Sequence, residues 1–460
     1  MSVVKIIGAG LAGSEAALTL ARLGHEVKLY EMKPSHKTPA HQLSTFAELV
    51  CSNSLKAERL ASASGLLKRE GLCLGSKLLP IAFDTKVPAG GALAVDRERF
   101  SQEVTAALRG EAGIELIEAQ VETIPDGPTL IATGPLTDET LMEELAHLFG
   151  EAQLAFYDAA APIISAESVD QTIAFKASRY GRGDAEDYLN CPMNKEEYEA
   201  FYERLVTAKT APVHGFERKK LFSGCMPIEE IARTGKDSMR FGPLKPVGMK
   251  DPKTGQRPYA CVQLRKENLN GEMLNLVGFQ TRLTFPEQKA VFSMIPGLQN
   301  AQFFRYGVMH RNSFICAPRL LNACFSAKQR SDLFFAGQLT GLEGYVPAIL
   351  SGLVAALNLH HHLIGKAPLC FPKTTMIGAL QHYMTTENKD YQPMTATFGL
   401  LPPLEERIKD KQKRYTALSY RALQDLRDYV QRNGVCGLKE DLLETSLTEA
   451  KHLIQSESNP

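Results

Sequence analysis

The sequence lacks several features that would place it in a simple class. It has no CxxC pair, and its nine cysteines are an odd number, which argues against a disulfide framework or a thiolate zinc site. It has no apolar run long enough to span a bilayer, and residues 1–7 have the character of a strand rather than a signal peptide. We therefore expect a cytoplasmic protein with no membrane segment and no metal site.

The sequence also has no net charge, because 52 Lys and Arg residues balance 52 Asp and Glu residues. The balance conceals two basic segments. Residues 216–266 carry twelve basic against five acidic residues, and 407–432 carry eight against three. Local patches rather than total charge attract a polyanion. Each segment is equally compatible with a solvated charged face, so the charge pattern alone leaves nucleic acid binding open.

With 460 residues, the chain is too long for one compact core, so we expect two or more domains. Hydrophobic residues at 44% and charged residues at 23% are ordinary for a globular protein.

The clearest positive signal is the stretch VVKIIGAGLAGSEAALTLARLGHEVKLYEM at residues 3–32. An apolar run, a glycine turn, an alanine-rich helix and a second apolar run follow one another, which is the β-α-β pattern of a dinucleotide site. The helix N-terminus supplies unpaired N–H groups and the positive end of a dipole. An ordinary glycine turn would lack this context.

Each residue type in the pattern has a physical role. Gly8 permits the tight turn, Gly10 lets a pyrophosphate approach the backbone, and Gly13 lets helix and strand pack closely. Glu31, 18 residues beyond Gly13, is expected to bind the ribose hydroxyls. The expected cofactor contacts in this stretch are Gly8, Gly10, Leu11, Ala12, Gly13 and Glu31.

Two later segments extend the nucleotide fold. Residues 129–135 predict an apolar strand that stops at Thr133-Gly134, and residues 332–341 predict a strand that runs into Gly337 and Gln338. An uninterrupted helix is expected at 346–362. Flavin enzymes commonly end with such a strand, glycine and helix, whose N-terminus faces the pyrimidine edge of the isoalloxazine, so FAD is favoured over NAD alone.

Tyr345, at the start of that helix, is placed either to stack on the flavin or to serve as a capping aromatic. The tract His360-His361-His362 suggests a metal, but consecutive histidines on a helix point in different directions, so we expect it at the surface.

Between these segments lies a block without the Rossmann rhythm, broken by turn signals at 242–246 and 251–255. We therefore expect an α/β protein with a Rossmann-type, glutathione-reductase-like FAD-binding domain and an inserted α+β domain. The expected ranges are 1–164 for the first part of the FAD domain, 165–302 for the insertion, and 303–460 for the second part with C-terminal helices.

Two cysteines lie in loops that suggest chemistry. Cys51 occupies a long excursion after Glu31, and Cys225 lies in the turn FSGCMPI next to Arg218, Lys219 and Lys220, which could lower its pKa. Most cysteines are not catalytic, and either residue could equally be a packing residue.

Taken together, GAGLAGSEAA, FAELVCSNSLKAE, FSGCMPIEE, GFQTRLTFPEQ, RYGVMHRNSF and FAGQLTGLEGYVPAILSG resemble one family from residue 3 to about residue 400. It is the bacterial folate- and FAD-dependent tRNA (uracil-5-)-methyltransferase family, which makes ribothymidine at position 54 of the T-loop. Relatives that methylate ribosomal RNA remain an alternative. So do the larger flavoproteins that install carboxymethylaminomethyl groups on wobble uridine, although the contexts of Cys51 and Cys225 match the methyltransferase better.

The resemblance implies that Cys225 adds to uracil C6 and that Cys51 acts close to the flavin, as an acid/base or in handling the one-carbon unit. It also implies that 5,10-methylenetetrahydrofolate provides the carbon, FADH₂ carries it and supplies reducing equivalents, and NAD(P)H reduces the flavin. Candidates for folate or RNA contacts are Arg282, His310, Arg311 and Asn312, each of which could instead form a salt bridge or other contact at the domain junction. The segment 216–266 and a helix at 404–432 are expected to flank the flavin face.

Two other function classes fit less well. A disulfide or pyridine-nucleotide reductase would normally show CxxC or a second GxGxxG, and the sequence has neither. A non-catalytic RNA-binding flavoprotein would have no reason to place two cysteines in loops near the flavin. The sequence does not indicate the oligomeric state.

Overall fold

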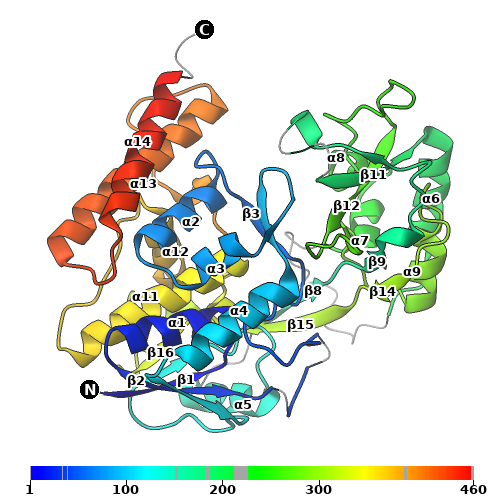
Figure 1. Ribbon diagram of the computed structural model, residues 1–460. Coiled ribbons are helices and arrows are strands. Elements are labelled where there is room, and N and C mark those ends of the chain that lie inside the picture. The colour runs from blue at the N-terminus through cyan, green and yellow to red at the C-terminus, as the bar shows by residue number, and fades with distance from the viewer. Residues whose placement is uncertain are drawn as a thin grey trace.

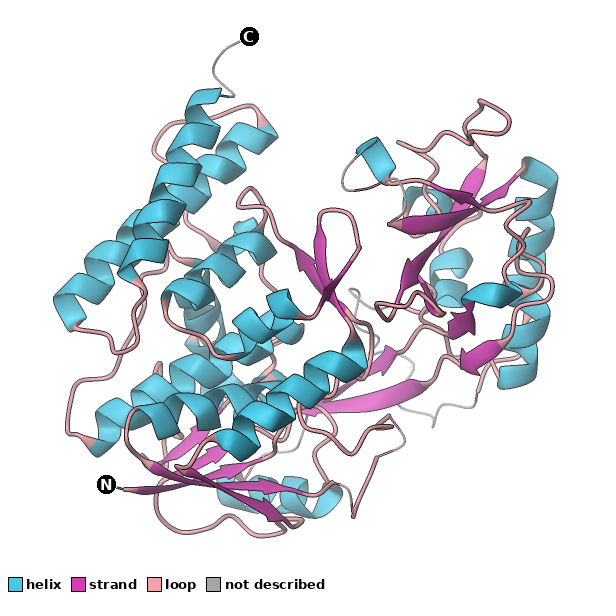
Figure 2. Cartoon of the chain, in the orientation of Figure 1, coloured by secondary structure: helices cyan, strands magenta, loops and turns pink. Residues whose placement is uncertain are grey.

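The computed structural model describes residues 2–33, 35–38, 40–150, 154–181, 184, 187–211, 226–387 and 391–456. For 154–159, 181, 309–311 and 456 it describes the backbone only. Two sheets lie on either side of the molecule, and a pair of long C-terminal helices rises beside the first of them (Figures 1 and 2).

The first sheet is parallel and has the strand order β16-β7-β1-β2-β6. Its strands are β1 (Val3–Ile7), β2 (Glu26–Glu31), β6 (Ile114–Glu118), β7 (Thr129–Ile131) and β16 (Leu333–Phe335). The central strand β1 is nearly all apolar, as expected for a strand covered on both faces. The predicted strands at 3–7, 129–135 and 332–341 therefore lie in one sheet, although β16 is far from the others in sequence.

Helices cover both faces of this sheet: α1 (Leu11–Arg22), α4 (Arg97–Gly110) and α11 (Tyr345–Leu363) contact it, and α5 (Glu139–Phe149) lies on the face opposite α1 and α11 (Figure 1). The other helices of this half pack on neighbouring helices and are α2 (Ala63–Cys73), α3 (Leu78–Asp84), α10 (Ala317–Leu320) and α12 (Met376–Thr385). Short 3₁₀ turns occupy Gln338–Thr340 and Phe398–Leu400.

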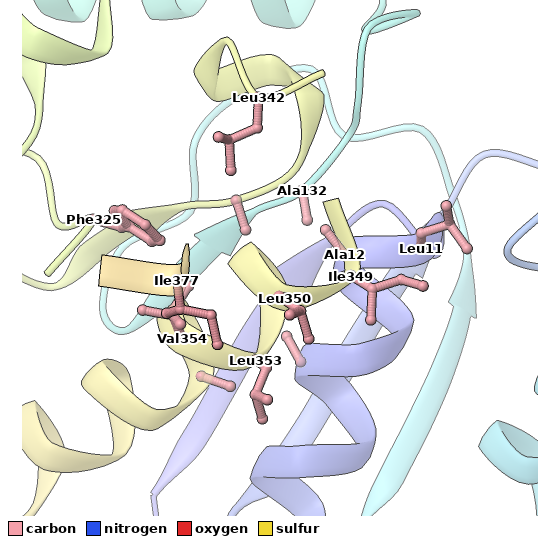
Figure 3. Packing of buried hydrophobic residues seen from close by; sticks show 14 of the residues in the cluster. Leu11, Ala12, Ala132, Phe325, Leu342, Ile349, Leu350, Leu353, Val354 and Ile377 are labelled. Carbon is pink, nitrogen blue, oxygen red and sulfur yellow. The ribbon is translucent and has the colours of Figure 1, made fainter. Parts of the chain in front are cut away.

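Helices α1 and α11 pack against each other at very short range. A Cβ on Gly352 would lie 2.2 Å from the carbonyl oxygen of Ala12, so only glycine fits at this crossing. Around the crossing, Figure 3 shows Ile349, Leu350 and Leu353 of α11 packed close to α1. This contact fixes the start of α11 relative to the glycine turn before α1.

The prediction that the His360-His361-His362 tract lies at the surface is wrong for two of the three histidines. His360 is 9% exposed and His361 is 4% exposed, because α11 is buried on nearly all sides where it packs against α1, α2 and β16. The Nδ1 atom of His360 lies 2.8 Å from Nε2 of His25, and His361 Nδ1 lies 2.7 Å from the carbonyl oxygen of Ala367. All three histidines were predicted to be exposed, but only His362 is.

A small antiparallel sheet joins the two halves of the molecule. Its strands are β3 (Ser54–Ala57), β4 (Lys86–Val87) and β5 (Ala92–Val95). The loop between β2 and β3 contains Cys51, so this sheet fixes one end of that loop.

The second large sheet is antiparallel, with the order β10-β11-β12-β13-β9-β14. Its strands are β9 (Ile163–Ser165), β10 (Phe175–Lys176), β11 (Tyr188–Met193), β12 (Ala260–Lys266), β13 (Met273–Leu276) and β14 (Phe303–Arg305). Its helices are α6 (Lys195–Thr207), α7 (Ile228–Arg233), α8 (Ser238–Phe241) and α9 (Phe285–Phe292), with 3₁₀ turns at Ala166–Ser168 and Arg179–Gly181.

This second sheet has a hydrophobic core of its own, which includes Tyr198, Phe201 and Phe292. An antiparallel ribbon of β8 (Leu154–Ala159) and β15 (Met309–Phe314) lies between the two sheets in the chain. Strand β9 begins and strand β14 ends just outside the insertion expected at 165–302. The domain boundaries themselves stay a prediction.

Helices α13 (Lys411–Asn433) and α14 (Glu440–Ser456) form the C-terminal pair, which packs on α2. The helix expected from residue 404 begins later, at Lys411. Asp410 caps the observed start by accepting a hydrogen bond from the Lys413 N–H at 2.8 Å. In the part of the chain described, no helix is both long and apolar enough to cross a membrane.

Candidate active site

A first cavity, of about 90 Å³, lies at the carboxyl ends of the parallel strands. It is lined by Ile7, Gly8, Gly10, Tyr30, Glu31, Met32, Lys33, His41, Glu48, Ala119, Gln120, Val121, Thr133, Leu136, Thr137, Asp138 and Leu141. This is the edge where open α/β sheets bind nucleotides.

Glycine is needed at each of the three positions of the turn for a different structural reason. Gly8 has φ +98°, and a Cβ there would lie 2.8 Å from the Ala132 carbonyl oxygen. Gly13 allows close packing, since its Cβ would lie 1.8 Å from the Gly8 carbonyl oxygen. Gly10 is different, because a Cβ there would meet nothing within 4 Å and would project into the space that a ligand needs.

The start of α1 is free to receive an anion. Gly10 is its N-cap residue and gives no side-chain cap, so the first N–H groups of the helix have no such partner. Leu11 and Ala12 are buried and offer only their backbone. Glu31, at the end of β2, accepts hydrogen bonds from the N–H groups of Ala9 at 2.7 Å and Lys33 at 3.1 Å, which holds its carboxylate beside the glycine turn.

A second cavity, of about 260 Å³, lies nearer the insertion. It is lined by Val50, Cys51, Ser52, Ser54, Leu55, Lys56, Ser64, Pro135, Gln280, Asn312, Gln338, Glu343, Gly344, Tyr345, Val346, Pro347, Thr395 and Ala396. The residues after β7 join the two cavities, because Thr133 lines the first and Pro135 the second, with Gly134 between them at φ +73°. An extended cofactor can therefore reach from one cavity to the other.

The start of α11 faces this second cavity. Its N-cap residue, Gly344, has no side-chain capping bond, so the positive end of the helix is directed at the cavity. Gly337 has φ +79° and donates its N–H to Ser351 Oγ at 2.7 Å. Gln338 donates from Nε2 to the Glu343 carboxylate at 2.5 Å.

Cys51 lies in the wall of the second cavity, and Tyr345 positions it. The Tyr345 Oη atom accepts hydrogen bonds from the backbone N–H groups of Cys51 at 2.9 Å and Ser52 at 3.1 Å. Burial raises the pKa of Tyr345, so its hydroxyl stays protonated at neutral pH. The sequence suggested stacking or capping for this ring. Its contact with the Cys51 loop was not foreseen.

Two buried arginines hold the chain just before Cys51. Arg97 donates to the Leu49 carbonyl oxygen at 2.7 Å, and Arg305 donates to the Val50 carbonyl oxygen at 2.6 Å. Arg97 also forms a salt bridge with Glu267 at 2.8 Å, so a carboxylate balances its charge. Among the described residues, Arg305 has no such salt bridge. Burial and the nearby Arg97 charge lower the pKa of Arg305, and the Cys51 thiol opposes that shift.

Asn53 ties the same loop to the second sheet. Its side chain is fully buried, accepts from Arg265 Nε at 3.0 Å, and donates to the carbonyl oxygens of Val95 and Lys266, both at 3.0 Å. Sequence reasoning missed the roles of Arg97, Arg265 and Arg305. The polar run after Cys51 was the available signal for Asn53.

Asn312, on β15, has an unusual environment. It is 0% exposed, lines the second cavity, and neither its Nδ2 nor its Oδ1 atom has a hydrogen-bond partner in the protein. Buried amides are almost always paired, so a ligand in this cavity is the natural partner. The side chains of His310 and Arg311, on the same strand, lie outside the described part.

Arg282 does not face open solvent. Its guanidinium pairs with Glu230 and lies 3.8 Å from Glu229, while its N–H donates to Glu229 at 2.9 Å. The salt bridge that was weighed as the alternative is therefore present, and Gln280, nearby in the chain, lines the cavity instead.

Cys225 and the neighbouring Arg218, Lys219 and Lys220 lie outside the described residues. The chain resumes beside the site, since the Ile228 N–H donates to the Gln280 carbonyl oxygen at 2.7 Å. Of the other cysteines, burial raises the pKa of Cys73 and of Cys261 to about 12 each. Among the residues described, no cluster of three or more His, Cys, Asp or Glu could hold a metal.

Comparisons with known proteins agree with this geometry. A family model described as glucose inhibited division protein A matches residues 3–367. Proteins named methylenetetrahydrofolate--tRNA-(uracil-5-)-methyltransferase TrmFO are similar. That of Lactobacillus gasseri is 53% identical and covers 93% of this chain and 98% of its own length. That of Acetivibrio thermocellus is also 53% identical and covers 93% and 99%.

Among solved structures, GidA of Aquifex aeolicus matches with a TM-score of 0.69 at 17% identity, over 98% of this chain and 76% of that one. A second crystal form matches with the same TM-score, over 98% and 79%. The predicted fold class is thereby confirmed.

Proposed function

Because the chain belongs to the family of methylenetetrahydrofolate-dependent tRNA (uracil-5-)-methyltransferases, within the wider glucose inhibited division protein A family, we propose that it methylates uracil C5 in tRNA. The proposed target is uridine 54 of the T-loop. The proposed carbon donor is 5,10-methylenetetrahydrofolate, with FAD as the cofactor and NAD(P)H as the reductant.

The two joined cavities suit FAD. The open space at Gly10 and the uncapped start of α1 fit a pyrophosphate, Glu31 fits the ribose hydroxyls, and the start of α11 fits an electron-rich pyrimidine edge. The unpartnered amide of Asn312 fits the lactam edge of a planar heterocycle. When bound, FAD would supply the redox chemistry and carry the one-carbon unit.

Cys225 is the proposed nucleophile. Uracil C5 reacts poorly until a thiolate adds to C6, which forms an S–C bond and moves the C5=C6 electron pair into an enolate. After C5 has bonded to the one-carbon unit, loss of the C5 proton expels the thiolate and restores the double bond. In the sequence, Cys225 precedes Ile228 by three positions, and the Ile228 N–H donates to the carbonyl oxygen of Gln280, which lines the cavity.

Cys51 is the proposed acid/base in the cavity wall. The Arg305 charge and the positive end of α11 both favour a thiolate there, and the hydrogen bonds to Tyr345 fix the backbone of Cys51. A T-loop uridine would have to leave its tertiary contacts and turn out of the loop to reach this wall.

The observation that carries the proposal is that one cavity brings together Cys51, the start of α11 and the unpartnered Asn312 in a chain 53% identical to named methyltransferases. The test incubates protein, FAD, NADPH and ¹⁴C-methylenetetrahydrofolate with an unmodified tRNA transcript and, separately, with ribosomal RNA. Label in 5-methyluridine of the tRNA is expected, and a uridine 54→cytidine transcript should remain unlabelled. Methylation with S-adenosylmethionine alone, or label confined to ribosomal RNA, would overturn the proposal.

A further inference from the structure

A single lysine lies at the exposed rim of the second cavity. Among the described residues that line this cavity, Lys56 is the only Lys or Arg, and its side chain is exposed. Its Nζ atom donates to Thr395 Oγ1 at 2.8 Å, a neutral partner that also lines the cavity. Within the described part of the chain, no carboxylate forms a salt bridge with Lys56. Its ammonium group is therefore accessible to an anionic ligand.

The backbone at Lys56 departs from regular strand geometry. The pairing of β3 with β5 shifts register between Ser54 and Ala57, and Lys56, within that shift, has φ +65°. This left-handed conformation is disfavoured for lysine. The buried Lys68 donates from Nζ to the carbonyl oxygens of Ala57 at 2.9 Å and Lys56 at 3.4 Å, which holds the irregular turn in place. Such bulges redirect side chains and are common beside active sites, and this one keeps Lys56 at the rim.

Lys56 also lies beside the start of α11, where the helix dipole is positive. A Cβ built on Gly344, the N-cap residue, would lie 3.7 Å from Lys56 Nζ and 3.6 Å from Thr395 Oγ1. The ammonium and the positive helix end repel each other in the free protein. Glu343, the acidic residue of the lining, accepts from Gln338 Nε2 at 2.5 Å. A carboxylate bound between Lys56 and the start of α11 would remove the repulsion.

One small anion matches this arrangement better than a polynucleotide does. A nucleic acid backbone is held by several cations, whereas one ammonium group and one helix start suit a single carboxylate. Lys86, the other lysine of the small sheet, already pairs with Glu58 at 2.6 Å. The fully buried Asn312 amide, unpartnered in the same cavity, indicates independently that the cavity receives a ligand.

We infer that Lys56 binds a carboxylate of the glutamate tail of the folate substrate at the rim of the second cavity. This inference rests on the proposed function. Folate joins a planar heterocycle to a flexible tail that ends in carboxylates, so it extends from an enclosed site to an exposed one. The heterocycle belongs inside the cavity, and Lys56 marks the exposed end. Lys56 thus selects folates that carry the tail and takes no part in the chemistry.

The test compares two ligands on the full-length FAD-loaded protein, tetrahydrofolate and tetrahydropteroylamide, in which an uncharged amide replaces the glutamate. Binding is followed by the change in flavin absorbance. The wild type should prefer tetrahydrofolate by about 10-fold, as expected for one charge-assisted hydrogen bond, and Lys56→Met should lose that preference. The variant should bind the amide as the wild type does. Its KM for methylenetetrahydrofolate should rise by the same factor, while KM for tRNA and the flavin content stay unchanged.

Three further variants control the comparison. Lys86→Met removes an exposed lysine of the same sheet and should keep the preference for tetrahydrofolate. Lys56→Arg should keep most of it, because the charge remains. Lys56→Gly relieves the left-handed strain, so it should unfold at a urea concentration no lower than the wild type does, yet lose the preference. Damage to the fold would therefore not explain the loss.

Several results would overturn the inference. They are a wild type that binds both ligands equally, a Lys56→Met variant that keeps the preference, and one that loses affinity for both ligands alike. A rise in KM for tRNA alone would assign Lys56 to the RNA, and loss of flavin would assign it to the cofactor. If the wild type neither binds tetrahydrofolate nor methylates tRNA, the proposed function fails, and this inference fails with it.

Discussion

The hydroxyl of Tyr345 accepts the backbone N–H of Cys51 at 2.9 Å, across a separation of 294 residues in the chain. The tyrosine begins α11, and the cysteine lies in the loop between β2 and β3. The helix whose positive end faces the second cavity therefore also fixes the cysteine in the wall of that cavity.

Tyr345→Phe should lower methylation 10- to 100-fold while FAD stays bound. The change leaves the N–H groups of Cys51 and Ser52 without their acceptor, at a cost of about 1–3 kcal/mol for a buried donor. The measurement is the methylation rate together with the flavin content from the visible spectrum. Tyr383→Phe, on α12, is the matched control. Loss of flavin in Tyr345→Phe would mean that the ring serves the cofactor rather than the loop.

Gly10→Val should abolish FAD binding without unfolding the protein, because its side chain would enter the space left for the pyrophosphate. Gly13→Val should instead impair folding, since its side chain meets the Gly8 carbonyl oxygen. Glu31→Ala should weaken FAD binding less than Gly10→Val does. Flavin absorbance and circular dichroism of the purified variants separate the cases, with Gly110→Ala as a control in open space. A yellow Gly10→Val protein would contradict the placement of FAD.

A trapping experiment should distinguish the roles of the two proposed catalytic thiols, Cys225 and Cys51. Cys225→Ser and Cys51→Ala should each reduce methylation by several orders of magnitude and leave FAD bound. A tRNA with 5-fluorouracil at the target position should form a stable adduct with the wild type and with Cys51→Ala, but not with Cys225→Ser. The reverse pattern would exchange the two roles. Replacing exposed Cys370 should have little effect on either measurement.

Arg305→Met should shift the reactivity of Cys51 to higher pH. Removing a buried positive charge beside the thiol disfavours the thiolate, so alkylation by iodoacetamide should need a more alkaline solution. The rate of Cys51 labelling is followed by mass spectrometry from pH 5 to pH 10. Arg69→Met, on α2, provides a control for loss of a positive charge elsewhere. An unchanged profile would show that Arg305 acts only as a backbone anchor.

Lys68→Met should remove a pH dependence of folding stability. Lys68 is 2% exposed and donates to the carbonyl oxygen of Ala57 at 2.9 Å, and burial lowers its pKa to about 7. Between pH 7 and about 10.4 the unfolded state binds more protons than the folded state, so this group makes stability rise with pH, by at most about 1.4 kcal/mol per unit. Urea unfolding at pH 7 and pH 9.5 compares the two proteins. An equal rise in Lys68→Met would assign the dependence to other groups.

The nucleotide half could be predicted because its demands on the sequence are local. A tight turn needs Gly8, a close helix contact needs Gly13, and a buried parallel strand needs the apolar run before them. The strand that runs into Gly337 was predicted far along the chain, but its pairing with β7 was not.

The charged part of the site could not be predicted in the same way. Arg97 and Arg305 have ordinary neighbours in sequence, and their importance arises only where two folded sheets meet the Cys51 loop. The prediction that His360 and His361 are exposed failed for a related reason. Whether a polar helix face is buried depends on what packs over it, which the local sequence does not show. Asn312 was selected through the family resemblance, and its unpartnered amide became evident only from its surroundings.

The position of β16 in the parallel sheet also has a consequence for protein synthesis. Strand β7 ends at Ile131, and its neighbour β16 begins at Leu333, so about 200 residues separate their translation. At roughly 10 residues per second, the ribosome needs about 20 s to make that stretch. Throughout that interval the nascent sheet has an unpaired edge, and α1 lacks its partner α11. A chaperone that protects this edge would therefore act before the protein can take up its cofactor.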